Sequence, residues 1–118
     1  MRAPAFLGVG MAIALTIGGA ARAQVAVEND YPTVARADYV FGCMATNGQS
    51  REALEKCACS VDVIASILPY EQYIEAETVM SMSLVGGDRM SIFRTAPHLK
   101  AMVADLRRAQ AEAEIRCF

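Results

Sequence analysis

Four cysteines constrain this chain more than any other feature: Cys43, Cys57, Cys59 and Cys117. An even number of cysteines in a short exported chain favours two disulfides. Each bond would contribute about 2–4 kcal/mol, which is comparable with the whole net stability of a small domain. Any fold for this sequence must therefore bring distant parts of the chain to within bonding distance.

The N-terminal segment has the order of features found in a secretory signal. Met1-Arg2 supplies a positive charge, residues 3–17 carry no charge, and Ala21-Arg22-Ala23 has the small-x-small form of a signal peptidase site. The uncharged run is shorter than the roughly 20 residues that a membrane-spanning helix needs. We therefore predict a signal peptide over 1–23, a mature chain from Gln24, and a periplasmic or secreted protein.

Charge and hydropathy exclude two classes of function for the mature chain. Loss of residues 1–23 removes two of the 11 basic residues and none of the 13 acidic ones, so the net charge changes from −2 to −4. A mildly acidic domain without a basic cluster is a poor nucleic-acid binder. No segment after the signal is apolar over the length of a membrane span, so we expect no membrane-spanning helix in the mature chain.

The remaining sequence is typical of an all-α fold, because it has few glycines and prolines and its apolar residues recur at helical spacing. We predict a flexible arm over 24–32 and one helical domain over 33–118, a small disulfide-stapled bundle of about four helices. The expected helices cover 33–47, 51–68, a segment from Pro69 to the stop at Gly86-Gly87, and a long last helix ending near Cys117. Thr33, Ser50 and Thr95 are the candidate N-caps, and residues 88–94 are expected to form a short turn of helix.

Helix geometry ranks the three possible cysteine pairings. In a hairpin that turns near Gly48, Cys43 and Cys57 have an axial offset of roughly 4.5 Å, whereas Cys43 and Cys59 are offset by roughly 7.5 Å. Cys43–Cys57 is therefore preferred, which leaves Cys59 for Cys117. The third pairing, Cys57–Cys59, would close a strained ring within one helix. In the preferred pairing Cys59 faces the polar side of its helix, so the end of the last helix must pack there.

Two other roles for the cysteines stay open at this stage. Cys57 and Cys59 could form a thiol-redox pair, although such pairs ordinarily have C-x-x-C spacing at a helix N-terminus. The cysteines could also bind a metal together with the only histidine, His98, but their spacing matches no zinc pattern. We expect structural disulfides, no metal site and no cofactor.

A carboxylate interrupts an apolar stripe on the third predicted helix. Tyr73 and Glu77 share that stripe, and a charge there must be paired, exposed or shifted towards its neutral form. One interpretation is a salt bridge to Arg94 or Arg107, or a hydrogen bond to a tyrosine. The other is a small ligand-binding pocket formed by Tyr70, Tyr73 and Glu77.

No catalytic motif stands out. The serines lack a G-x-S-x-G elbow, and the chain has no C-x-x-C-H haem site, phosphate loop or calcium loop. We predict that the protein is not an enzyme and has no catalytic residues.

Several short segments carry a resemblance to a family: 39–44, 47–48, 57–62, 70–78, 93–94 and 111–118. The chain resembles a group of small exported proteobacterial proteins without an assigned activity, some of them associated with PQQ-dependent alcohol oxidation. The resemblance implies a periplasmic address and an accessory role beside a quinoprotein dehydrogenase or its cytochrome.

Together these patterns predict a periplasmic, non-enzymatic accessory protein that binds another periplasmic protein. The alternatives are a protein that binds a small ligand or metal and a thiol-redox protein that uses Cys57 and Cys59.

Overall fold

The computed structural model describes residues 29–118, so the predicted signal peptide and residues 24–28 of the arm lie outside the described residues. Every regular element in the described part is helical, which confirms the all-α prediction. The elements are α1 (Thr33–Asn47), α2 (Arg51–Ile67), α3 (Tyr70–Ser83), the 3-10 helix η1 (Asp88–Met90), α4 (Ile92–Thr95) and α5 (Pro97–Cys117). Four of them are long, as expected, and α4 is a single turn.

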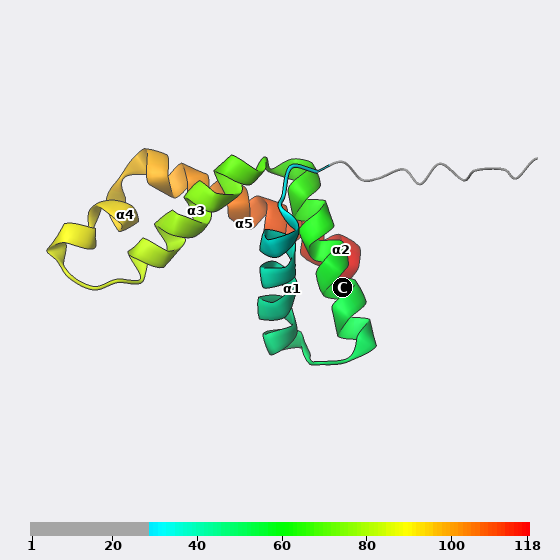
Figure 1. Cartoon of the computed structure of the whole chain (residues 1–118). Coiled ribbons are helices and arrows are strands. Elements are labelled where there is room, and N and C mark those ends of the chain that lie inside the picture. Colours follow the sequence, from blue (N-terminus) through cyan, green and yellow to red (C-terminus); the bar gives the residue numbers. More distant parts are fainter. Residues whose placement is uncertain (1–28) are drawn as a thin grey trace, which may run out of the picture.

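The helices form two arms that share α5 (Figure 1). Helices α1 and α2 make an antiparallel hairpin, and α3 leaves it at a steep angle. Helix α5 then returns behind α3 and ends beside α2, so it packs against both. We call α1, α2 and residues 109–117 the stapled arm, and residues 70–103 the distal arm.

The hydrophobic core lies where α2, α3 and α5 meet. Its buried residues are Tyr31, Val61, Ile64, Leu68, Ala76, Leu106, Ala109 and Ala113. Alanines on α3 and α5 let these helices approach closely, while Ile64 and Leu106 are completely buried and fill the centre. The core therefore joins the two arms at the middle of α5.

The ends of α2 follow the predicted signals. Ser50 caps its N-terminus, because its hydroxyl accepts a hydrogen bond of 3.1 Å from the Ala53 N–H. Before it, Gly48 ends α1 with a φ of 101°, a left-handed conformation that favours glycine. At the other end, Leu68 is extended (φ −120°, ψ 120°) because it precedes Pro69.

Other predicted helix ends are wrong. Helix α3 stops at Ser83, before the expected stop at Gly86-Gly87, and Leu84 serves as its C-cap. Thr95 does not cap α5: it is the last residue of α4, and its hydroxyl donates to the Ser91 carbonyl. Thr33 is the first residue of α1 and its side chain caps nothing. In each case the residue type is compatible with a helix cap, but the helix begins or ends at another residue because of the local backbone conformation.

The arm expected to be flexible is anchored over its described residues. Tyr31 is only 5% exposed and its hydroxyl donates a 2.9 Å hydrogen bond to the Leu68 carbonyl. Asp30 accepts a hydrogen bond of 2.9 Å from the Tyr70 N–H, which would otherwise be unpaired at the start of α3. These contacts tie Asp30 and Tyr31 to the helical domain, and the flexibility of the arm over 24–32 stays a prediction. Tyr31 lies outside the helices, so its burial leaves no repeating pattern in the sequence and could not be predicted from helical spacing.

Within residues 29–118, no helix combines the length and the apolar character needed to cross a membrane.

Candidate binding grooves and the disulfide framework

All four cysteines are bonded, in the pairing that the axial offsets favoured. Cys43 pairs with Cys57 and Cys59 with Cys117, and the Cα atoms are 5.8 Å apart in both bonds. Cys57 is completely buried and no cysteine is free. In this structure Cys57 and Cys59 thus bond to different partners and not to each other.

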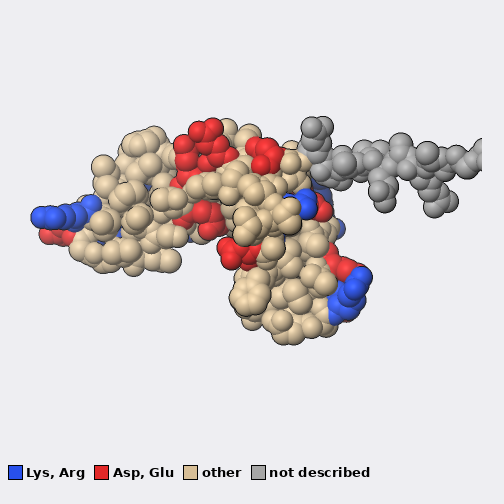
Figure 2. All heavy atoms as spheres, in the orientation of Figure 1, with Lys and Arg blue, Asp and Glu red and all other residues tan. Residues whose placement is uncertain are grey.

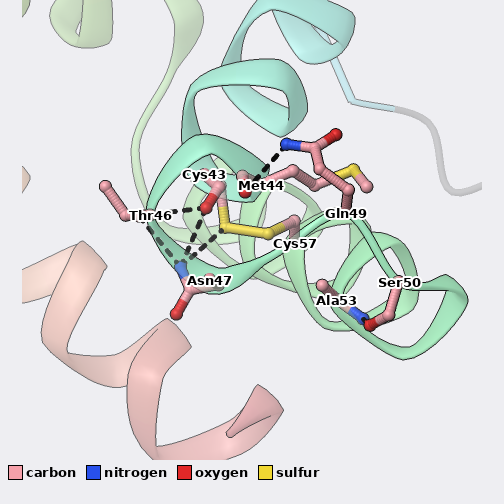
Figure 3. Close-up of a disulfide and its surroundings, with 8 residues drawn as sticks. All are labelled: Cys43, Met44, Thr46, Asn47, Gln49, Ser50, Ala53 and Cys57. Atoms are coloured by element: carbon pink, nitrogen blue, oxygen red, sulfur yellow. Dashed lines mark hydrogen bonds between the residues drawn. A yellow bond between two sulfur atoms is a disulfide. The ribbon is translucent and has the colours of Figure 1, made fainter.

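The first disulfide links α1 and α2 near the turn that closes their hairpin (Figure 3). Asn47 Nδ2 donates to the Cys43 carbonyl at 2.9 Å and lies 3.6 Å from the Cys43 sulfur. Thr46 donates to the same carbonyl, and Gln49 donates to the carbonyl of Met44. The Met44 carbonyl also accepts a hydrogen bond of 3.0 Å from the Gly48 N–H, so side chains and backbone together pair the carbonyls at the end of α1.

The second disulfide fastens the end of α5 to α2. Cys59 is half-buried and its neighbour Ser60 is buried. Helix α5 therefore covers the polar side of α2, on which Cys59 lies. Lys56 extends this contact, with its Nζ 5.7 Å from the centroid of the Phe118 ring. Both disulfides therefore belong to the stapled arm.

The three residues predicted as a ligand site lie together in one groove between α1 and α3. Tyr70, Tyr73 and Glu77 line a groove of about 500 Å³, opposite Asp38 of α1. Asp38 was not among the predicted site residues, because only the approach of α1 to α3 brings it there. The structure thus brings the predicted residues together, and ligand binding by them stays a prediction.

Glu77 does not form the salt bridge that was one of its two interpretations. Arg94 instead donates to the carbonyls of Ser83, Val85 and Gly87, and Arg107 lines a separate groove. Burial raises the pKa of Glu77, and the nearby Asp38 carboxylate raises it further.

The tyrosines around this groove pack into a cluster. The Tyr31 ring centroid lies 5.1 Å from those of both Tyr70 and Tyr73, at tilted angles. Burial raises the pKa of Tyr73, and the negative charge of Glu77 adds to the shift. Burial also raises the pKa of Tyr39, against a hydrogen bond with Ser60 that lowers it. Both shifts favour the neutral hydroxyl over the phenolate.

A second candidate surface lies on the outer side of the α1–α2 hairpin. This groove of about 500 Å³ is mainly apolar, lined by Ala37, Val40, Phe41, Met44, Leu54 and Ala58 among others. Phe41 is 77% exposed at its edge. This groove was not predicted from the sequence, although the absence of charged residues from Tyr39 to Asn47 was a usable signal.

Within residues 29–118, no group of three or more His, Cys, Asp or Glu side chains is placed to hold a metal ion.

Comparisons with known proteins give no match: no family model matches the chain, and no curated protein or solved structure is significantly similar to it. The resemblance to small exported proteobacterial proteins accordingly remains a prediction.

Proposed function

We propose that this protein is an exported, non-enzymatic accessory protein that binds another periplasmic protein through the α1–α2 groove. Two closed disulfides support an oxidising compartment. The observation that carries the proposal is the exposure of apolar side chains along this groove, above all Phe41.

Helix α1 is unusual for a helix on a protein surface. It has no fully buried residue, yet it carries only two charges, Arg36 and Asp38, and none after Asp38. Its inner face is half-buried through Tyr39 and Cys43, so the outer face would ordinarily be polar. Instead this face exposes Phe41, and such contiguous apolar surface is typical of interaction sites.

The shape of the groove favours a helix as the bound element. Two antiparallel helices leave a shallow channel between them, and a third helix with an apolar stripe completes their packing. Phe41 and Leu54, 77% and 37% exposed, would then be buried in the interface. At one end of the groove Arg36 and Asp62 lie 4.0 Å apart, so neither charge is left alone.

The family resemblance adds a class of partner to test. It suggests a periplasmic quinoprotein dehydrogenase or its cytochrome, and the groove fits an amphipathic helix on either. No residue of this chain is assigned to the partner's chemistry, because the proposal concerns binding alone.

Site-specific photocrosslinking tests this proposal in the periplasm. A photoreactive phenylalanine analogue at position 41 should give one discrete crosslinked product, whose mass identifies the partner. The same analogue at position 115, which replaces the 80% exposed Ile115 outside the groove, is the matched control. With that partner purified, Phe41→Ser should weaken binding by at least about tenfold, since exposed aromatic residues often dominate interfaces.

Ile115→Ser should leave the partner's Kd unchanged. The proposal fails if both positions crosslink to the same products, or if Phe41→Ser binds the partner as tightly as the wild type.

A further inference from the structure

The groove between α1 and α3 continues into a second groove, and together they form a trough along one side of α1. The second groove has a volume of about 470 Å³ and shares Asp38, Tyr73 and Glu77 with the first. Beyond them it reaches Glu114 of α5. We call this continuous surface the acidic trough.

The acidic trough carries negative charge without a neighbouring cation. Asp38, Glu77 and Glu114 line it, and neither groove has a lysine or arginine among its lining residues. None of the three takes part in an ion pair within the part of the chain that the structure describes. Two arginines close by in sequence pair elsewhere: Arg36 with Asp62 and Arg116 with Glu112.

Figure 2 shows the same imbalance on one face of the molecule. Acidic side chains gather over α3 and in the corner where α3 meets α1, whereas the most prominent basic side chains on this face lie at its far ends, beside acidic ones. A concave surface with charge of one sign concentrates the field and attracts ions of the opposite sign. The trough therefore favours a cationic ligand.

The walls of the trough indicate what kind of cation it would take. Beside the carboxylates lie the tyrosine rings and an apolar strip of Val34, Ile74 and Met82, all three more than a third exposed. Hard metal ions prefer six or more oxygen ligands, and this surface does not offer them around one point. An organic cation would match it, because ring faces attract ammonium groups and the apolar strip would cover a hydrocarbon body.

We propose that the acidic trough binds a small organic amine, with its ammonium group between Asp38 and Glu77 and its apolar body along Tyr73 and Ile74. This site lies apart from the Phe41 groove and does not depend on the proposed protein partner. It gives a chemical class to the small-ligand alternative that Tyr70, Tyr73 and Glu77 suggested.

Intrinsic fluorescence offers a local readout of binding. The chain has no tryptophan, and its four tyrosines all lie in or beside the trough: Tyr31, Tyr39, Tyr70 and Tyr73. The purified protein, with both disulfides closed, should be titrated with cyclohexylmethylamine, which does not absorb where tyrosine does. Its uncharged analogue cyclohexylmethanol has almost the same shape and tests the need for charge. Isothermal titration calorimetry should give the same affinities.

The amine should bind at least tenfold more tightly than the alcohol, and the difference should shrink as salt is added. Glu77→Gln and Asp38→Asn should each weaken amine binding by at least fivefold. Glu75→Gln is the matched control, because Glu75 is exposed on α3 and lines a different groove with Met102 and Asp105. Phe41→Ser should bind the amine normally, so this test and the partner test can fail separately.

Three results would overturn the proposal. They are equal binding of amine and alcohol, an equal loss of binding in Glu75→Gln and Glu77→Gln, and displacement of the amine by an equimolar amount of Mg²⁺. Far-UV circular dichroism and thermal unfolding of each variant would separate a loss of binding from a loss of fold. Asp38→Asn is the safer variant, since Asp38 is exposed and its replacement removes no buried contact.

Discussion

The stapled arm and the distal arm are held together in different ways. Both disulfides lie in the stapled arm. The bond of the completely buried Cys57 links α2 to α1, and the bond of Cys59 links α2 to α5. In the distal arm, residues 84–95 include no buried residue, and Leu84 is 87% exposed. Hydrogen bonds from Arg94 to three carbonyls hold the turn between α3 and α4.

This contrast shows how one small domain can contain two levels of local stability. Segments with few buried apolar contacts open at lower free energy than segments that open only with the whole domain. The distal turn should therefore open independently, whereas the cysteine-linked helices should open only on global unfolding. Mutations in the two arms should therefore differ in their effects on global stability and on hydrogen exchange.

Removing the second disulfide should cause the largest loss of stability. Its cysteines are 58 residues apart and those of the first bond 14, so loop entropy gives about 4 kcal/mol for Cys59–Cys117 and about 3 kcal/mol for Cys43–Cys57. Urea unfolding of the C59A/C117A and C43A/C57A proteins measures both losses. A larger loss in C43A/C57A would show that native packing around the buried Cys57, and not loop length, decides the order.

Truncation in the core should come next. Leu106→Ala removes a completely buried side chain where the two arms meet and should lower the free energy of unfolding by about 3 kcal/mol. Leu84→Ala, at the tip of the distal arm, should change it by less than about 0.5 kcal/mol. Urea unfolding of both variants gives the comparison. If their losses are similar, the distal turn is part of the cooperative core.

Loss of the Arg94 side chain should have a smaller and more local effect. Arg94→Ala leaves the carbonyls of Ser83, Val85 and Gly87 to water and should cost about 1 kcal/mol. Hydrogen exchange should speed up over 84–95 and stay unchanged in α2. Arg94→Lys should rescue the slow exchange only partly, because an ammonium group cannot span three carbonyls. Equal acceleration in α2 would contradict independent opening.

The pH dependence contributed by Glu77 should be the smallest effect. Burial and the neighbouring Asp38 raise its pKa in the folded protein, while Tyr39, Tyr73 and Glu114 supply no positive charge. The folded state therefore favours neutral Glu77 and loses stability as pH rises from the ordinary pKa of 4.5 through the raised value.

Glu77→Gln should remove this loss, so the variant should gain stability relative to the wild type as pH rises from 4 to 8. Urea unfolding at several pH values measures the effect, and Glu75→Gln serves as the control. Parallel curves for Glu77→Gln and the wild type would show that the carboxylate is solvated.

The predictable parts of the fold are those set by local chemistry or by fixed helix geometry. Ser50 and Pro69 mark helix ends through their own backbone and hydrogen-bonding preferences. The axial offset between Cys43 and Cys57 follows from the rise of a helix, so it could be worked out before any packing was known.

What could not be predicted depends on how helices approach one another. Tyr31 is buried by elements distant in sequence, and Asp38 meets Glu77 only because α1 lies across from α3. Patterning assigns each residue to a face of its own helix but does not say which other helix faces it. The absence of charged residues from one face of α1 could be recognised in the sequence. Without the arrangement of the helices, however, such a face is equally typical of a helix side that is buried in the core.

The pairing of the disulfides also bears on how the molecule can be assembled. Counted along the chain, the first cysteine bonds to the second and the third to the fourth. If the chain is exported as proposed, an oxidase that joins cysteines in the order in which they emerge from a translocation channel would form these bonds directly. The hairpin could then be locked while the rest of the chain was still in transit, and no later exchange of disulfides would be required to reach the native state.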